Sequence, residues 1–212
     1  MRSLEIGVCH IYMPRFDNKP VDELLDYIQD GTDDRLFAIA QLIRCGVDLG
    51  LIYDRTKIDM LFLEKIKNIV EFEAVLKSHP RDEATLFAAK KLGFSDKYIG
   101  QVWDMTEKEV FLLRKAHGFM PVYKMIDTCA SEFESYVPYF YSTYEKENES
   151  VVSDRKKIIV LGSGPIRIGQ GVEFDYSTVH AIWTIRRAGY EAIIINNNPE
   201  TVSTDYTTSD KL

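Results

Sequence analysis

The fold is decided by the stretch Lys157-Ile-Ile-Val-Leu-Gly-Ser-Gly-Pro-Ile-Arg-Ile-Gly-Gln-Gly171. Its apolar run at 158–161 is typical of a buried parallel strand, and a glycine-rich loop follows it directly. The next residues predict a helix that begins near Ser177 and ends at Gly189, and Ala192–Ile195 predict a second buried strand. Strand, glycine loop, helix and strand form a βαβ unit, whose crossover we expect to be right-handed.

The glycine-rich loop is similar to two nucleotide-binding motifs and matches neither. A dinucleotide fingerprint has a third glycine where this chain has Arg167. A P-loop has Lys followed by Ser or Thr where this chain has Gln170 and Gly171. The loop could still hold an anion through its backbone N–H groups, or Gly162 and Gly164 could simply allow a tight turn. Both interpretations remain open.

Polar residues flank the predicted helix on both sides. Glu173 and Asp175 lie near its start, where carboxylates are stabilised by the helix dipole, so we expect capping or loop bracing rather than acid–base catalysis. Asn196 to Asn198 end the second strand, at the edge where α/β sheets bind ligands. Their amides could bind polar groups, or they could form the turn before Pro199. We therefore predict no catalytic residue in this chain.

The preceding part of the chain, from Val21 to about Gly118, has helical periodicity. Gly46, Gly93 and Gly118 each follow an apolar run and are expected to end helices at positive φ. The pattern predicts a helix around residues 36–43, capped by Asp33 or Asp34, a longer helix opening at Asp59, and short helices at about 82–92, 95–103 and 106–117.

Two of these helical segments repeat one pattern. In 46–59 and 93–106, Ile52 matches Ile99 and the caps Asp59 and Thr106 fall at the same offset. A short helix, a turn and a second helix are found in helix-turn-helix DNA readers and in plain packing modules. Both candidate recognition helices carry Glu beside Lys or Arg, which favours a solvated surface over a DNA-binding one.

Composition narrows the possible functions. The chain has 212 residues and a net charge of −7 with no basic run, which argues against nucleic-acid binding. It has no apolar stretch of the roughly 18 residues that a membrane span needs, and no signal-peptide pattern. Its three cysteines and four histidines show no metal-ligand spacing, so we expect reduced thiols and no bound metal.

Several of these motifs together resemble one enzyme family. Leu161–Ser177 looks like the opening of a synthetase half of the carbamoyl-phosphate synthase large chain, and Asn198–Asp205 fits the second half. Phe62–Ile69 and Pro121–Phe133 resemble the helical oligomerisation domain that joins the two halves, and Arg2–Gly7 resembles the end of the first ATP-grasp module. The resemblance covers essentially the whole chain.

The resemblance implies a mixed fold, an all-α helical domain followed by a partial α/β unit of the pre-ATP-grasp, Rossmann-like type. The implied domains are the tail of the first ATP-grasp module at 1–20, the helical oligomerisation domain at 21–153, and the truncated start of the second pre-ATP-grasp domain at 154–212. The chain would then be an internal fragment of a longer enzyme.

The resemblance also implies a reaction. Such a ligase makes carbamoyl phosphate from bicarbonate, ammonia released from glutamine and two ATP, for arginine or pyrimidine biosynthesis. It uses ATP with Mg (or Mn) and K, and it sits in the cytoplasm, or in the mitochondrial matrix for an ammonia-type enzyme. The nucleotide-covering loop and the magnesium-binding Glu-x-Asn are not found in this chain, so the fragment alone should bind no cofactor and catalyse nothing.

The implied partners are the two ATP-grasp halves of the same chain, a glutaminase subunit or domain, and further copies through the helical domain, with no nucleic acid and no membrane. The reactive carbamate intermediate must be sheltered from water. The tunnel or loop candidates are Gly162, Gly164, Arg167, Gly169, Gly171, Glu173 and Asn198. Gly169 and Gly171 are placed beside the carbamate path, or Gly171 only permits close packing. The alternatives are a helix-turn-helix DNA-binding protein and a small nucleotide-binding module.

Overall fold

Helices form in the first part of the chain wherever apolar residues recur at the spacing of one helix face. The computed structural model describes residues 7–127, 132, 138–162, 171–196 and 201–212, without the side chains of 171–174. The chain forms two units, Met1–Met120 and Pro121–Leu212. The first unit contains a 3-10 turn, η2 (Pro14–Phe16), and the helices α1 (Val21–Tyr27), α2 (Arg35–Arg44), α3 (Leu49–Thr56), α4 (Met60–Ser78), α5 (Glu83–Lys91), α6 (Asp96–Trp103) and α7 (Glu107–Ala116).

The predicted helix boundaries are confirmed by their caps. The side chains of Asp59 and Thr106 accept hydrogen bonds from backbone N–H groups at the starts of α4 and α7, and Thr106 forms a full capping box with Glu109. Asp34 stands at the start of α2, but its side chain makes no cap hydrogen bond. Gly46, Gly93 and Gly118 follow helices at φ of 79°, 86° and 74°, as predicted.

The two repeated segments adopt the same structure, α3 followed by α4 and α6 followed by α7. Each short helix ends in a left-handed residue, Lys57 at φ 55° and Asp104 at φ 53°. Ile52 and Ile99 are fully buried at equivalent positions. The repeat is therefore one of structure as well as sequence, and the second helix of the first copy is much the longer.

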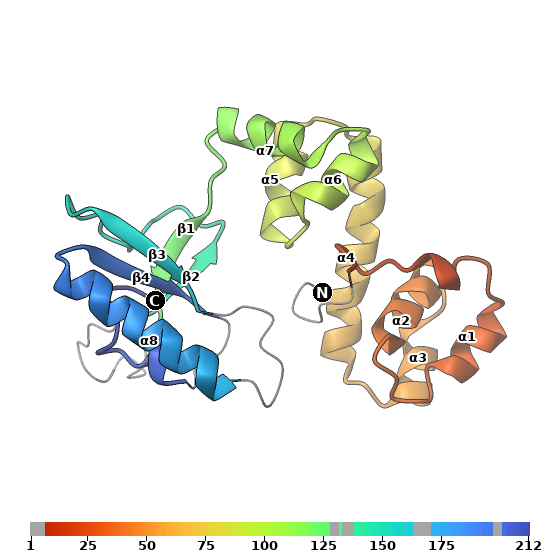
Figure 1. Ribbon diagram of the computed structural model, residues 1–212. Coiled ribbons are helices and arrows are strands. Elements are labelled where there is room, and N and C mark those ends of the chain that lie inside the picture. The colour runs from red at the N-terminus through yellow and green to blue at the C-terminus, as the bar shows by residue number, and fades with distance from the viewer. Residues whose placement is uncertain (1–6, 128–131, 133–137, 163–170, 197–200) are drawn as a thin grey trace. The chain divides into compact units, whose positions relative to one another are not determined.

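The long helix α4 connects two hydrophobic cores. The first core, with Leu24, Phe37, Ile52 and Leu63, lies where α2 and α3 pack on the N-terminal half of α4, and the second lies where α5 and α6 pack on its C-terminal half (Figure 1). The second core contains Leu76, Leu86, Ile99, Trp103 and Val110. Ile69 packs against both. Among the described residues no helix has the length and apolarity to cross a membrane.

The second unit contains the predicted βαβ unit. Strands β3 (Lys157–Leu161) and β4 (Glu191–Ile195) are parallel and are joined through helix α8 (Gly171–Arg187), with Ile159 opposite Ile193. A separate antiparallel pair is formed by β1 (Val122–Met125) and β2 (Phe140–Thr143) (Figure 1). The expected fold class, a helical domain followed by a partial α/β unit, is confirmed.

One boundary of this unit was predicted wrongly. Helix α8 begins at Gly171, not near Ser177. The first side chains of α8 that the structure describes as buried are Thr178 and Val179, while Tyr176 is 66 % exposed. Among the described side chains of α8, the buried positions begin at Thr178, close to the predicted start.

The end of the chain packs against this small sheet. After a 3-10 turn, η3 (Val202–Thr204), Lys211 bridges to Ile193 of β4, and the N–H of Leu212 donates to the carbonyl of Pro138 at 2.7 Å. Ile182, Ala192 and Ile194 form a core between α8 and the sheet. The opposite sheet face stays open, because Ile159 and Leu161 are 57 % and 72 % exposed.

Candidate functional site

The carboxyl edge of the parallel strand pair is the first place to look for a ligand site in an α/β unit. Leu161 and Ile195 are paired at the ends of β3 and β4, and Gly162 is the first residue beyond β3. The N–H of Gly162 donates to the carbonyl of Ile195 at 2.9 Å, so the pairing continues one residue past the strand. Gly162 therefore lies directly at this edge of the sheet.

Gly162 lies in a closely packed place at this edge. A Cβ atom added to it would lie 2.9 Å from Cδ1 of Ile194 and 3.2 Å from Cγ2 of Thr178. The 2.9 Å approach would force the tip of Ile194 to shift, and the 3.2 Å approach is tighter than most Cβ contacts. The sequence allowed two interpretations of Gly162, an anion-binding role or a tight turn. The structure shows Gly162 at a point where β3, β4 and α8 converge.

Asp175 braces the loop after β4. Its Oδ1 and Oδ2 accept from the backbone N–H of Ser203 at 3.1 and 3.3 Å. The side-chain amide of Asn196 donates to Oγ of the fully buried Ser203 at 3.3 Å, and Oγ1 of Thr201 lies 3.1 Å from the same Oγ. The bracing role expected for Asp175 is confirmed, and it ties the second turn of α8 to η3.

The remaining sequence candidates are only partly placed. Gly171 is the first residue of α8, and Glu173 is in its first turn with a side chain that the structure does not describe. The others, Gly164, Arg167, Gly169 and Asn198, lie outside the described residues. Gly162 is therefore the one sequence candidate for which the structure describes neighbouring side chains.

The described part of this edge presents a small set of polar groups. Its donors and acceptors are hydroxyl groups, backbone amides, the amide of Asn196 and the carboxylate of Asp175. The carboxylate accepts from the backbone N–H of Ser203. Within the described residues no three His, Cys, Asp or Glu side chains come together as metal ligands.

A second group of charged residues lies inside the helical unit. Glu73 of α4 is buried and accepts a bidentate pair of hydrogen bonds from Arg44 of α2, at 2.9 Å from Nε and 2.7 Å from Nη2. Nε2 of His10 lies 2.8 Å from Oε1 of the same carboxylate, and the His10 ring stacks on Tyr98 of α6 at 3.7 Å. This cluster connects the N-terminal segment to both halves of the unit.

The cluster shifts the pKa values of two of its members. Burial by itself would raise the pKa of the Glu73 carboxyl, but the hydrogen bonds and positive charge of Arg44, with those of His10, outweigh it and lower the pKa from 4.5 to about 2. Burial raises the pKa of Tyr98 to about 12, and the nearby Glu73 carboxylate adds to the effect. Glu73 is thus held as an anion at neutral pH.

A similar cluster holds the second repeat together. Asp96 of α6 accepts from Lys90 of α5 at 2.8 Å and from Nε of Arg114 of α7 at 2.9 Å. Lys90 also donates to the carbonyl of Phe94 at 2.7 Å, and Lys90 and Arg114 are both buried. Arg114 is therefore engaged inside the fold, which removes one of the few basic side chains that a DNA-reading α7 would have offered.

Sequence reasoning missed both clusters. Their members lie far apart in the chain, as His10, Arg44, Glu73 and Tyr98 do, so no spacing connects them. The one available signal was that Glu73 falls on the apolar face of α4, between Val70 and Leu76. A carboxylate at such a position predicts a buried partner, because an unpaired buried charge is very costly.

Comparison with known proteins gives two matches. The sequence model described as carbamoyl-phosphate synthetase large chain, oligomerisation domain, matches residues 1–118. The model described as carbamoyl phosphate synthase preATP-grasp domain matches residues 154–212. The first match corresponds closely to the helical unit, and the second contains the βαβ unit. The domain boundaries expected from the sequence stay a prediction.

Proposed function

Because the chain belongs to the carbamoyl-phosphate synthase large-chain family, we propose that it is the connecting segment of such an enzyme. The helical part holds the two synthetase halves together, and residues 154–212 begin the half that phosphorylates carbamate. One observation carries the proposal: an oligomerisation-domain match is followed by a preATP-grasp match in the same chain. That order is expected where the first half of the enzyme passes into the second.

The proposed whole enzyme is an ATP-dependent ligase. It makes carbamoyl phosphate from bicarbonate, ammonia and two ATP, and the ammonia comes from glutamine through a glutaminase subunit or domain. The product would serve arginine or pyrimidine biosynthesis in the cytoplasm. ATP, Mg or Mn, and K act in the ATP-grasp modules in this proposal, and the segment itself catalyses no step.

The helical unit is suited to a positioning role. The Glu73 cluster joins residues from the N-terminal segment, α2, α4 and α6, and the Asp96 cluster joins α5, α6 and α7. Buried charge networks of this kind are satisfied in only one arrangement of the elements that contribute to them. A unit that must keep two catalytic halves in register, and associate with further copies, benefits from such a fixed arrangement.

In this proposal, the βαβ unit helps to keep the carbamate intermediate away from water. Carbamate and its precursor hydrolyse in water, so the path between the halves has to exclude it. Gly169 and Gly171 are the proposed positions beside this path, and Gly171 begins α8. A bulky residue at Gly171 in the whole enzyme is expected to raise ATP consumption per carbamoyl phosphate formed.

The proposal is tested by two measurements on the chain as it is. We expect no bicarbonate-dependent ATP hydrolysis, and calorimetry with ATP and Mg to show no binding tighter than millimolar. A large chain with both ATP-grasp modules is the positive control. Clear turnover, or tight ATP binding within these residues, would contradict the proposal. Salt-dependent binding to duplex DNA would contradict it too and would support the helix-turn-helix alternative.

A third observation addresses the joining role itself. The reading frame on either side of this segment should encode ATP-grasp modules, each with a magnesium-binding Glu-x-Asn. Frames that encode unrelated domains on both sides would refute the joining role even if the segment proved inactive.

A further inference from the structure

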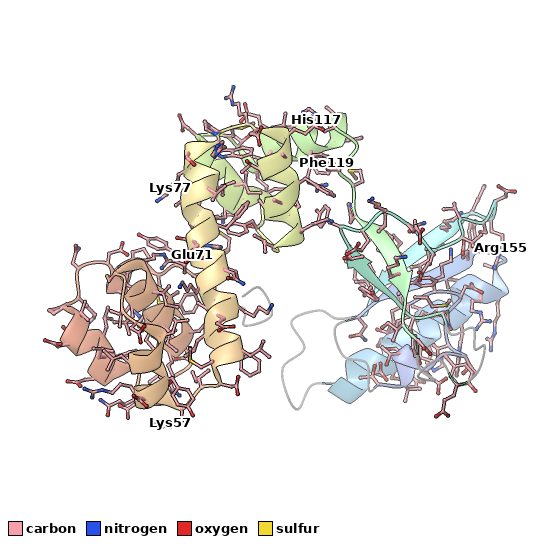
Figure 2. All side chains as sticks on the ribbon, turned by 180° about the vertical axis from the view of Figure 1, so that it is seen from behind. Lys57, Glu71, Lys77, His117, Phe119 and Arg155 are labelled. Atoms are coloured by element: carbon pink, nitrogen blue, oxygen red, sulfur yellow. The ribbon has the colours of Figure 1, made fainter. Side chains whose placement is uncertain are left out.

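Residues 9–11 form a short irregular segment that contacts both groups of helices in the first unit. Helices α1–α3 contribute to the first hydrophobic core and α5–α7 to the second, toward the two ends of α4. Figure 2 labels Lys57, at the end of α3, beside the first group and His117, at the end of α7, beside the second. The segment contains no helix or strand, and we call it the latch.

The latch is anchored in the first core. Ile11 is buried in that core, and Val8 and Met13, on either side of the latch, pack against it. The carbonyl of Ile11 accepts a hydrogen bond from Nη2 of Arg44 on α2 at 2.7 Å. The anchored end of the latch is therefore fixed to the first group of helices.

The other end of the latch, its tip, reaches the second group. The buried ring of His10 stacks on Tyr98 of α6, with the ring centroids 3.7 Å apart, and lies 4.9 Å from the ring of Phe94 in the second core. The carbonyl of Cys9 accepts from Oγ of Ser95, the N-cap residue of α6, at 3.3 Å. Neighbouring residues of the chain are thus fixed to different cores.

The polar side chains that hold the tip keep other partners when His10 withdraws. Glu73, which lies 2.8 Å from Nε2 of His10, keeps its two hydrogen bonds from Arg44 at 2.7 and 2.9 Å. Ser95 keeps the hydrogen bond that its Oγ accepts from the N–H of Tyr98 at 3.1 Å. A buried polar group that keeps a partner avoids the cost of being left unsatisfied. The contacts at the tip can therefore break without stranding these two side chains.

We propose that the latch is a releasable lock between the two groups of helices. With His10 inserted, α5–α7 are held in one arrangement relative to α1–α3. With His10 withdrawn, the two groups move relative to each other about α4 while both cores stay folded. Each core has its own set of buried residues, and Ile69 packs against both, which suits such a motion. The inference goes beyond the proposed function and does not depend on it.

The position of the latch in the chain indicates how it is released. The backbone turns at Gly7, whose φ of 78° is a conformation that favours glycine, shortly before His10. A displacement of the residues before Gly7 therefore acts on the tip through a segment that has no helix or strand to resist it. Segments of this kind open at lower free energy than the helices that they contact.

The first test measures a distance across the helical unit of the full chain by double electron–electron resonance. Spin labels are attached to ketone-bearing residues introduced at two exposed positions, Asp22 of α1 and Lys108 of α7, so the native cysteines stay unaltered. The variant is His10→Leu, which keeps an apolar side chain and removes the hydrogen bond to Glu73. The matched control is His117→Leu, which removes an exposed histidine of the same unit.

The unaltered chain and His117→Leu should each show one narrow distance distribution. His10→Leu should broaden the distribution, because loss of a hydrogen bond to a charged group raises the population of the open arrangement on the order of tenfold or more. His10→Gln retains an N–H donor for Glu73 and should restore part of the narrow distribution. Far-ultraviolet circular dichroism should be the same for all of these chains, because both cores stay folded.

The second test reports on release of the tip in the unaltered chain. Cys9 is half-buried, with Sγ 3.8 Å from Oε1 of Gln101 on α6, whereas Cys45 is exposed. Iodoacetamide, with mass spectrometry of the peptides, should modify Cys9 more slowly than Cys45. Dilute urea should leave the Cys9 rate unchanged, because opening of the latch exposes little surface. His10→Leu should raise the Cys9 rate on the order of tenfold and leave Cys45 unchanged.

The possible results decide between a latch and an ordinary packed segment. A narrow distance distribution in His10→Leu with an unchanged Cys9 rate would overturn the inference, and a faster Cys9 rate with an unchanged distance would refute the motion about α4. Loss of the helical signal in His10→Leu would show that His10 is a general core residue. A Cys9 rate that rises with urea as steeply as unfolding does would show that the tip is released only when the whole unit unfolds. Equal effects of His10→Leu and His117→Leu would also count against the latch.

Discussion

Replacing Glu73 by Gln tests whether the buried ion cluster holds the helical unit together. The change keeps the size of the side chain and removes its charge. It leaves Arg44 and His10 beside a neutral amide, in place of a carboxylate that accepts from Arg44 at 2.7 and 2.9 Å. Because Arg44 is itself only partly exposed, it regains little hydration to compensate.

The expected magnitude follows from the pKa of Glu73. Its shift from 4.5 to about 2 means that the folded unit stabilises the ionised form. At about 1.36 kcal/mol per pKa unit, this sets a ceiling of about 3 kcal/mol, and breaking a buried ion pair costs a similar amount. We expect Glu73→Gln to lower the free energy of unfolding by about 2 kcal/mol at neutral pH, after a discount for residual solvent screening.

The assay should follow the helical unit alone. Trp103 is buried in that unit and Trp183 lies in the other, so a Trp183→Phe background makes fluorescence a report on Trp103. Urea unfolding at pH 7 should show a midpoint lower by about 1 M, given a slope of about 1–3 kcal/mol per M. The control is Glu64→Gln, which removes an exposed charge from the same helix.

The pH dependence provides the refuting result. The folded pKa of Glu73 lies below its ordinary value, so its contribution is complete above about pH 4.5 and is lost as the pH falls towards 2. The stability difference between the unaltered chain and Glu73→Gln should therefore shrink between pH 5 and pH 3. A difference that is no larger than that of Glu64→Gln, or that stays constant over this range, would refute the role given to the cluster.

Three further changes test other parts of the structure. Gly162→Ala should destabilise the second unit by about 1–2 kcal/mol in thermal unfolding, because the new methyl group meets the tip of Ile194 at 2.9 Å. Thr106→Ala should cost about 1 kcal/mol in urea unfolding of the helical unit, because it removes the capping box. Asp175→Ala should speed amide hydrogen exchange at Ser203 by about tenfold, because the N–H loses its acceptor.

Each of these changes has a control. Gly31→Ala should leave stability unchanged, because no heavy atom lies within 4 Å of its added Cβ. Thr106→Ser should keep most of the capping energy, because it retains the hydroxyl group that accepts from Glu109. Asp175→Asn keeps one acceptor oxygen and should slow exchange relative to Asp175→Ala. Equal effects of a change and its control would contradict the contact in question.

The sequence predicted most of the secondary structure because that information is local. Caps such as Asp59 and Thr106, and glycines such as Gly46 and Gly93, act on the few residues next to them. The structural repeat was visible for the same reason. The start of α8 was predicted six residues too late, at Ser177 instead of Gly171.

The contacts between distant segments were decided by the tertiary structure alone. The sequence showed that Glu73 is a carboxylate on an apolar helix face, but only the packing of α2, α4 and the N-terminal segment brings Arg44 and His10 to it. In the same way, Gly162 was readable as a loop glycine, and only the approach of Ile194 and Thr178 shows why a larger residue does not fit. Side-chain partners of this kind depend on where whole elements pack, which no local spacing in the chain encodes.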